Sequence, residues 1–248
     1  MYLHIPIFFK MKRKEKKMKL TKRLEEISKL VDKGCIIADI GTDHGYIPVY
    51  LLEKNIVPYA ILSDINKGPL ENASEEVRKR KLTDKVSLRL GGGLSVLKEG
   101  EVDEIIIAGM GGILISEIIE ADYNICKSAK KLILQPMQAQ EELRRYLINN
   151  KFEIIGEHIT NEDFRIYQII EARYNPEYIF DGNEIEYEFP KKLVEKKDPL
   201  VKKLIQTKID ECNKIIESLS KLENESVKER LNYIEERKRI LSEIKGIE

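Results

Sequence analysis

A glycine-containing loop with an acidic residue is the most informative segment for chemistry. Residues 38–48 read ADIGTDHGYIP. A dinucleotide-binding loop has the pattern G-x-G-x-x-G, so that bare backbone can approach a pyrophosphate, but Asp43 stands where the middle glycine is expected. A carboxylate there repels a diphosphate and attracts a cation. The loop therefore favours S-adenosylmethionine, an adenosine that carries a sulfonium and an ammonium group.

Two residues of this loop are also candidates for direct roles in a reaction. Gly41 suits the sharp turn and Gly45 opens the next helix, while Asp43 and His44 lie between them. Asp43 also fits a simpler role as a helix cap. A lone histidine at a helix N-terminus is more often a structural hydrogen-bonding group, because the helix dipole disfavours its protonated form. We expect His44 to contact cofactor or substrate if it acts directly.

Further candidates follow the next predicted strands. Asp64 lies 23 residues beyond Gly41, where an acid would hold a ribose diol. The glycines of residues 91–93 leave space for a flat ring, although a plain flexible turn explains them equally well. Gln135 ends a later apolar run and could supply an amide to the rim of an acceptor pocket, or simply end the strand.

The end of the fourth predicted strand indicates which kind of atom accepts the methyl group. Residues 105–112 read IIIAGMGG and lack the Asn/Asp-Pro-Pro-aromatic cluster that suits methylation of an exocyclic amine. The segment NPEY at residues 175–178 falls after the predicted sheet and is interpreted as a turn. A ring nitrogen with an in-plane lone pair, such as adenine N1, is therefore the easier acceptor. Such an acceptor needs neither a strong base nor a metal.

The elements that position these residues follow from hydrophobic periodicity. A helix is predicted over residues 20–31, with Thr21 as its N-cap. Five strand-then-helix segments follow, which predicts an α/β fold with a mostly parallel, Rossmann-like sheet covered on both faces. Two further β-rich runs within residues 152–174 suit an antiparallel hairpin at the sheet edge. Ligands of such sheets bind beyond the carboxyl ends of the strands.

Past Asp181 the apolar residues step by four and three, which predicts a coiled-coil-like helical hairpin. The predicted seam includes lysines at Lys208 and Lys238. A break at residues 223–226 favours two antiparallel helices, although one continuous helix stays open because the break has no Gly or Pro. The expected organisation is a disordered or mis-started tail over 1–17, a cofactor-binding domain over 18–180 and a helical extension over 181–248.

Charge and cysteine usage narrow the class of protein. The formal net charge is zero, but residues 191–248 carry 15 Lys/Arg against 12 acids, whereas residues 21–190 carry 21 against 30. A basic end on an acidic core is compatible with a polyanionic partner, and equally with solvated helix faces. The three cysteines are scattered and show no metal-binding spacing, which indicates a reducing compartment. We predict no membrane segment, no metal and no particular oligomer.

Taken together, the segments KLTKRLEEISKLV, ADIGTDHGYIPVYL, SDINKGPLENA, IAGMGG and LILQPM resemble the bacterial tRNA (adenine(22)-N(1))-methyltransferase family, the TrmK family. The resemblance implies a class I methyltransferase, a cytoplasmic location, and a helical C-terminal domain that helps to hold tRNA. It also implies an acceptor adenine that leaves its stack and receives the methyl group directly at N1. The cofactor site would comprise Gly41, Asp43, His44, Gly45, Asp64, Ile65, Asn66, Gly92, Gly93 and Gly109.

One residue departs from the family pattern, and other functions compete. Family members usually read LGDGL after the third strand, where the acid accepts from the adenine amine, but this chain has Gly92.

A methyltransferase with another acceptor would share every cofactor residue and need no basic extension. A non-catalytic RNA-binding protein would be compatible with Gly92. A nicotinamide dehydrogenase is disfavoured because the middle glycine is missing. The tRNA phosphates would contact the helical extension and residues 78–81.

Overall fold

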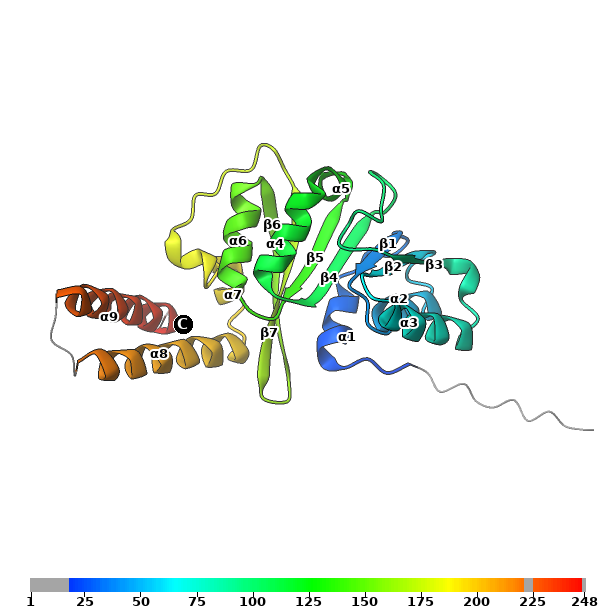
Figure 1. Cartoon of the computed structure of the whole chain (residues 1–248). Coiled ribbons are helices and arrows are strands. Elements are labelled where there is room, and N and C mark those ends of the chain that lie inside the picture. Colours follow the sequence, from blue (N-terminus) through cyan, green and yellow to red (C-terminus); the bar gives the residue numbers. More distant parts are fainter. Residues whose placement is uncertain (1–17, 221–224, 247–248) are drawn as a thin grey trace, which may run out of the picture.

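Alternating strands and helices build a seven-stranded sheet in the order β3-β2-β1-β4-β5-β7-β6 (Figure 1). The computed structural model describes residues 18–220 and 225–246. The strands are β1 (Ile37–Ile40), β2 (Ala60–Asp64), β3 (Val86–Leu90), β4 (Glu104–Met110), β5 (Lys131–Pro136), β6 (Phe152–Glu162) and β7 (Arg165–Tyr174).

The first five strands are parallel, as predicted. Strand β1 pairs with β2 on one side and with β4 on the other, so that Ile37 lies opposite both Ala60 and Glu104. Strand β7 is antiparallel to β5 and to β6, which confirms the predicted edge hairpin. The strand order reverses between β1 and β4. The carboxyl ends of these two strands therefore flank the position where ligands of open α/β sheets bind.

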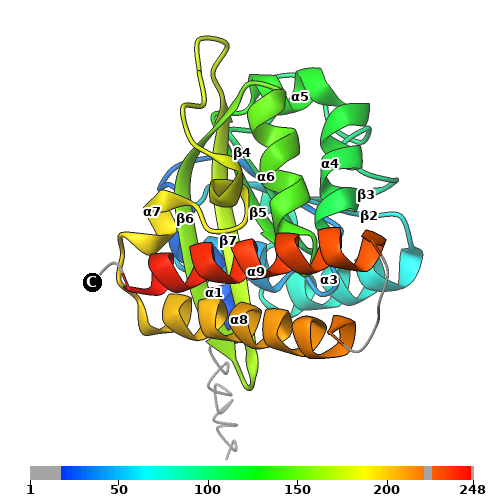
Figure 2. The same cartoon turned by 90° about the vertical axis from the view of Figure 1, so that its left-hand side faces the viewer.

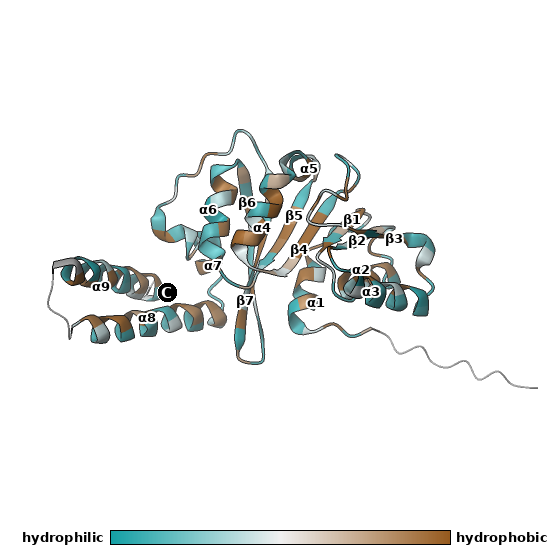
Figure 3. Ribbon diagram, viewed as in Figure 1, coloured by the Kyte–Doolittle hydropathy of each residue, from teal (hydrophilic) through white to brown (hydrophobic). Residues whose placement is uncertain are grey.

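Helices cover both faces of the sheet (Figure 1). One face packs against α1 (Lys22–Lys29), α2 (Tyr46–Glu53) and α3 (Lys67–Lys79), through an apolar cluster that includes Ile27, Ile47 and Ala73. The other face packs against α4 (Gly112–Ala121), α5 (Tyr123–Ser128) and α6 (Gln140–Asn149). Figure 3 shows apolar residues concentrated along the strands and on the helix faces that meet them.

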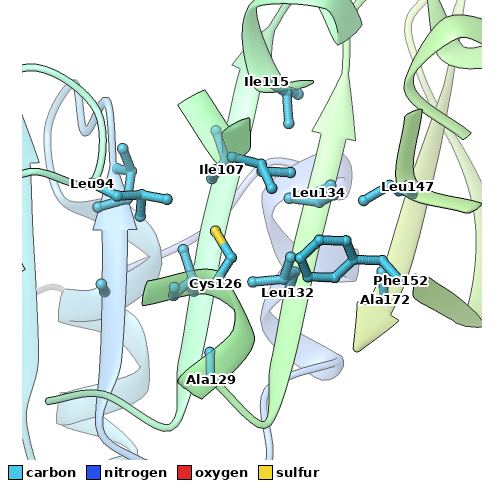
Figure 4. Packing of buried hydrophobic residues seen from close by; sticks show 14 of the residues in the cluster. Leu94, Ile107, Ile115, Cys126, Ala129, Leu132, Leu134, Leu147, Phe152 and Ala172 are labelled. Atoms are coloured by element: carbon cyan, nitrogen blue, oxygen red, sulfur yellow. The ribbon is translucent and has the colours of Figure 1, made fainter. Parts of the chain in front are cut away.

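The second face has a continuous apolar core. Ile115 of α4, Cys126 of α5 and Leu147 of α6 converge on Leu132 and Leu134 of β5 (Figure 4). All five residues are fully buried. The strands are fixed from both sides by this core and by the cluster on the first face, which holds their carboxyl ends in place.

Local capping defines where the helices begin. The Thr21 Oγ1 atom accepts a hydrogen bond from the Leu24 amide at 3.5 Å, so the leading helix starts at the predicted cap. Asp198 accepts from the Leu200 amide at 2.8 Å and starts α8 (Pro199–Leu219), which has proline in its first turn. A short 3-10 turn, η1 (Thr83–Lys85), precedes β3.

The C-terminal segment forms two antiparallel helices, as predicted. After η2 (Glu184–Tyr187) and α7 (Lys191–Val194), helices α8 and α9 (Glu225–Gly246) lie side by side (Figures 1 and 2). The apolar seam does not include the two predicted lysines, because Ile209 is buried while Lys208 pairs with Glu211 at 2.9 Å, and Lys238 lies outside the apolar cluster. The predicted seam position 222 lies outside the described residues. The remaining seam residues include Val201, Ile205, Cys212, Ile234 and Leu241.

A buried arginine joins the helical extension to the sheet. Arg144 of α6 is fully buried and forms a bidentate ion pair with Glu157 of β6, with N···O distances of 2.7 and 3.0 Å. Its guanidinium also donates to the Gln168 side chain at 2.5 Å and to the Tyr187 carbonyl at 3.0 Å. The segment that leads to α8 is therefore anchored through η2 to the sheet.

The remaining expectations concern the cysteines, membrane segments, the N-terminal tail and the domain boundary. The three cysteines are free. No helix within residues 18–220 and 225–246 is long and apolar enough to cross a membrane. The predicted tail of residues 1–17 lies outside the described residues. The division into domains at residue 181 stays an interpretation of the sequence.

Candidate active site

A cavity of about 420 Å³ opens at the carboxyl ends of β1 and β4, under the start of α1. It lies where the strand order reverses, which is the predicted place for a ligand. The loop after β1 supplies five of its fourteen lining residues. The lining residues are Thr21, Arg23, Leu24, Asp39, Gly41, Thr42, Asp43, His44, Gly45, Tyr46, Ile47, Ala108, Gly109 and Glu162.

The loop after β1 is held close to the neighbouring strand. The Gly41 and Thr42 amides both donate to the Ser63 carbonyl, at 2.8 and 2.9 Å, and the Gly45 amide donates to Thr42 Oγ1 at 3.1 Å. Gly45 has φ of +65°, and a Cβ added there would lie 2.6 Å from the Leu62 side chain. Glycine is required at this position because a side chain would be both strained and overpacked.

Two acids of this region have different environments. The Asp43 side chain is 78% exposed, whereas Asp39, the third residue of β1, is 8% exposed and lines the same cavity. Burial raises the pKa of Asp39 to about 6, and a hydrogen bond with Thr42 acts in the opposite direction. Of these two acids, which both line the cavity, Asp39 is therefore the buried one, while the proposed role of Asp43 stays a prediction.

An aromatic pair borders the cavity. The rings of His44 and Tyr46 are stacked, with centroids 4.9 Å apart and planes 8° from parallel. His44 Nε2 lies 3.5 Å from Asp43 Oδ2, and Tyr46 is 40% exposed. A flat, partly exposed platform of this kind is suited to stacking against a base that has left a helix.

Gln135 does not line the cavity but contacts Arg23, which does. Gln135 is fully buried, and its side-chain oxygen accepts from Arg23 Nη1 at 2.6 Å. Its amide nitrogen donates to the Pro136 carbonyl at 3.0 Å. The Arg23 guanidinium also lies 5.5 Å from the centre of the Tyr167 ring. Gln135 thus holds Arg23, which lines the cavity.

The other predicted cofactor residues lie further along the same edge. Asp64 ends β2, and its carboxylate accepts from the Asn66 amide at 2.7 Å. Ile65 is 70% exposed, and a Cβ added at Gly92 would lie 3.5 Å from its side chain. Asp64, Ile65 and Asn66 lie at or just after the end of β2, and Gly92 and Gly93 follow β3. None of these five residues lines the cavity. Gly109 does line it and has φ of +82°.

Besides Asp39, sequence reasoning missed two charged residues of the cavity, Arg23 and Glu162. Arg23 belongs to the amphipathic helix α1, where a basic residue resembles any solvated position. Glu162 ends β6, more than 110 residues from the glycine loop in sequence. Neither residue belongs to a local motif, so only the tertiary fold brings them to the glycine loop.

An acidic cluster elsewhere does not resemble a metal site. Ligand atoms of Asp32, Cys35 and Glu104 lie within 4.8 Å of one another. The Lys131 ammonium is 3.1 Å from the Asp32 carboxylate and 3.3 Å from that of Glu104, so a cation of the chain itself already occupies this position. The cluster lies at the amino ends of β4 and β5, at the opposite edge of the sheet from the cavity.

Comparison with known proteins identifies the family. Residues 20–170 match a family described as "Methyltransferase domain". The chain is 33% identical to the tRNA (adenine(22)-N(1))-methyltransferase of Bacillus subtilis over 92% of this chain and 97% of that protein. The chain belongs to the tRNA (adenine(22)-N(1))-methyltransferase family, TrmK.

Solved structures of TrmK proteins have the same fold. The B. subtilis M1A22 tRNA methyltransferase TrmK is 30% identical, with a TM-score of 0.81 and coverage of 92% of this chain and 99% of that one. M. capricolum TrmK, solved with S-adenosyl-homocysteine, is 29% identical, with a TM-score of 0.78 over 92% of this chain and 98% of that one. The similarity to TrmK therefore includes the helical extension as well as the sheet.

Proposed function

We propose that this chain transfers a methyl group from S-adenosylmethionine to N1 of adenine 22 of tRNA. The similarity to the B. subtilis enzyme carries the proposal, because it extends over nearly the full length of both chains. A relative from Streptococcus pneumoniae, 28% identical with a TM-score of 0.78 over 91% of this chain and 99% of that one, was solved with S-adenosyl-L-methionine. The cavity at the ends of β1 and β4 supports the same cofactor.

The residues present suit this cofactor. Asp39 offers a buried carboxyl group, and ionisation of that group becomes favourable beside a cation. Asp43 and His44 line the same cavity, and the absence of side chains at Gly41 and Gly45 allows the cofactor to approach the backbone closely. We assign the ribose to Asp64 and the adenine ring to the region of Ile65, Asn66, Gly92 and Gly93.

The chemistry requires orientation more than acid–base assistance. When bound, S-adenosylmethionine supplies a methyl group to the N1 lone pair, and the electron pair of the broken S–C bond stays on sulfur. The His44 and Tyr46 rings would stack against the extruded base. Arg23, held by Gln135, would fix the acceptor side of the cavity. Holding N1 in line with the methyl group and excluding water supplies most of the rate enhancement.

Methylation of an unmodified tRNA transcript tests the proposed function. With S-adenosylmethionine labelled on the methyl group, we expect incorporation into the transcript with adenine at position 22. We expect none when that position is guanine. Equal labelling of both transcripts, or labelling of neither, would contradict the proposal.

The substitution Gly92→Asp should strengthen cofactor binding. The backbone of Gly92 has no positive φ, and an added Cβ would make only ordinary contact with Ile65 at 3.5 Å. A restored acceptor for the adenine amine should contribute about 0.5–1.5 kcal/mol, or about two- to tenfold in Kd. Isothermal titration with S-adenosylmethionine measures the change. Gly92→Ala is the control and should bring no gain, and an unchanged Kd for Gly92→Asp would refute the assignment of Gly92 to the adenine ring.

Reversing two charges on α8 should weaken tRNA binding. Lys203 and Lys214 are exposed and lie three helical turns apart, so they share one side of α8. Changing both to glutamate should lower tRNA affinity and reduce the slope of log K against log salt by about two, since each lysine contributes about one phosphate contact. Filter binding at several salt concentrations measures both quantities.

The matched control reverses the charges of two exposed lysines, Lys33 and Lys98. They lie in the connections before β1 and β4, at the amino ends of the strands, whereas the cavity lies at the carboxyl ends. This variant has the same net charge as the α8 variant. It should retain tRNA affinity, and both variants should bind S-adenosylmethionine normally. Equal loss of tRNA affinity in the two variants would show that net charge alone, and not α8, determines binding.

A further inference from the structure

Glu162 is a charged residue of the cavity that the proposed cofactor contacts do not use. It ends β6, whose hairpin with β7 extends past the rest of the sheet edge and lies between α1 and the α8–α9 pair (Figures 1 and 2). Its side chain lines the cavity together with Asp39, His44 and Tyr46. The Oε2 atom is buried and has no hydrogen-bond partner within the described part of the chain.

An unpartnered buried carboxylate oxygen is unfavourable, because it has lost its water and gained no donor. Arg23, the one Lys or Arg among the residues that line the cavity, donates instead to Gln135 at 2.6 Å and lies over the Tyr167 ring. Among the residues that the structure describes, no ion pair joins Arg23 to Glu162. Glu162 is partly exposed and lines the cavity, so a rotation of its carboxylate would let a ligand with a hydrogen-bond donor satisfy this oxygen, which indicates a binding role for Glu162.

The position of Glu162 favours the acceptor over the cofactor. Asp39 of β1 and the glycine loop with Asp43, which joins β1 to α2, form one part of the cavity. Glu162 comes from β6, the last strand in the order and three strands beyond β4, and β6 lies next to the helix α1 that supplies Arg23. On its Watson–Crick edge, adenine has a single donor group, the exocyclic 6-amine, which is directly beside N1.

We propose that the Glu162 carboxylate accepts a hydrogen bond from the 6-amine of the target adenine, and so aims N1 at the methyl donor and selects adenine. This inference rests on the proposed function. Guanine would present its 6-carbonyl oxygen at the same position, where it would meet a carboxylate without a proton between them. Discrimination against guanine then follows from repulsion and from the unsatisfied acceptor.

The same contact favours the transition state. As the N1 lone pair forms the new bond to carbon, the ring gains positive charge that is shared with the 6-amine nitrogen. The amine keeps both protons and becomes a stronger donor, so its hydrogen bond to Glu162 strengthens as the reaction proceeds. An interaction that is stronger in the transition state than in the bound substrate raises kcat.

A substrate without the amine tests this inference. One tRNA carries adenine at position 22 and a second carries purine, which has N1 but no 6-amine. For the unaltered protein, we expect kcat/KM to be about ten- to a hundredfold lower with the purine tRNA. For Glu162→Met, kcat/KM with the adenine tRNA should fall by a similar factor, and the two substrates should then differ by less than about threefold.

Controls separate this role from a general loss of the site. Asp163→Asn changes the exposed neighbouring acid, whose positive φ of 53° asparagine tolerates, and should leave both rates unchanged. Glu162→Met should bind S-adenosylmethionine with unchanged Kd and should melt at an equal or higher temperature, because it removes a buried carboxylate oxygen that has no partner.

Three outcomes would overturn the assignment. Full discrimination between adenine and purine in an active Glu162→Met variant would exclude the contact with the amine. A weaker Kd for S-adenosylmethionine with discrimination intact would place Glu162 on the cofactor instead. If the unaltered protein methylates neither tRNA, the proposed function fails together with this inference, whereas the first two outcomes leave the proposed function standing.

Discussion

Replacing Asp39 with asparagine should weaken S-adenosylmethionine binding by about a hundredfold or more, because a buried carboxylate that faces a cation would be lost. The exposed neighbour Asp43 provides the matched variant, and Asp43→Asn should have a smaller effect. Isothermal titration at about pH 7.5 measures both. A larger loss for Asp43→Asn than for Asp39→Asn would show that Asp43 is the main partner of the cation.

The same substitution should stabilise the unliganded protein. Burial raises the pKa of Asp39 from an ordinary 3.8 to about 6. Because the folded state holds this proton more tightly than the unfolded state, the contribution of Asp39 to stability is fully present below about pH 4 and is lost as the pH rises to about 6. The loss amounts to about 3 kcal/mol above that pH.

An asparagine side chain at this position is neutral at every pH and does not incur this loss, so urea unfolding at about pH 7.5 should give a higher free energy of unfolding for Asp39→Asn. The difference should shrink at about pH 5. For the unaltered protein, cofactor affinity should also fall below about pH 6, because protonation then competes with the bound cation. Equal stability of the two proteins at both pH values would contradict this account of the buried carboxyl group.

Replacing Arg144 with methionine should destabilise the fold by about 3–5 kcal/mol, because it leaves the Glu157 carboxylate buried without its partner. The loss should also loosen the attachment of α8, since Arg144 holds the Tyr187 carbonyl. Denaturant unfolding measures the free energy, and hydrogen exchange in residues 184–219 measures the attachment.

The neighbouring residue Arg145 is the control. Its side chain is 37% exposed and pairs with Glu184 and Glu141 at the surface. Arg145→Met should therefore cost less than about 1 kcal/mol. Equal destabilisation by the two substitutions would contradict the importance of the buried pair, and a double variant, Arg144→Met with Glu157→Leu, should recover much of the loss.

The fold could be predicted from the sequence because its signals are local. Apolar runs such as residues 105–108 alternate with helix-period segments, and Thr21 and Asp198 lie where they cap helices. The predicted seam of the helical pair placed Lys208 where the structure buries the next residue, Ile209. A step of three residues and a step of four from Ile205 reach these two neighbouring positions, so periodicity alone does not choose between them.

The site could be predicted only where chemistry follows a local motif. Gly41, Asp43, His44, Gly45 and Gly109 do line one cavity. The burial of Asp39 could not be inferred, because an acid inside an apolar strand gives no local sign of whether its carboxyl group faces a ligand. The buried Arg144 likewise resembles a surface residue of an amphipathic helix, since its partners come from β6, β7 and η2.

A crystal structure with bound S-adenosylmethionine would test most directly whether a negative cavity beside β1 recognises a cationic methyl donor. We expect the methionine part of the cofactor in the cavity between β1 and β4, with a positively charged group within ion-pair distance of the Asp39 carboxylate. A cofactor bound elsewhere, or one whose cationic groups point away from Asp39 and Asp43, would contradict the account.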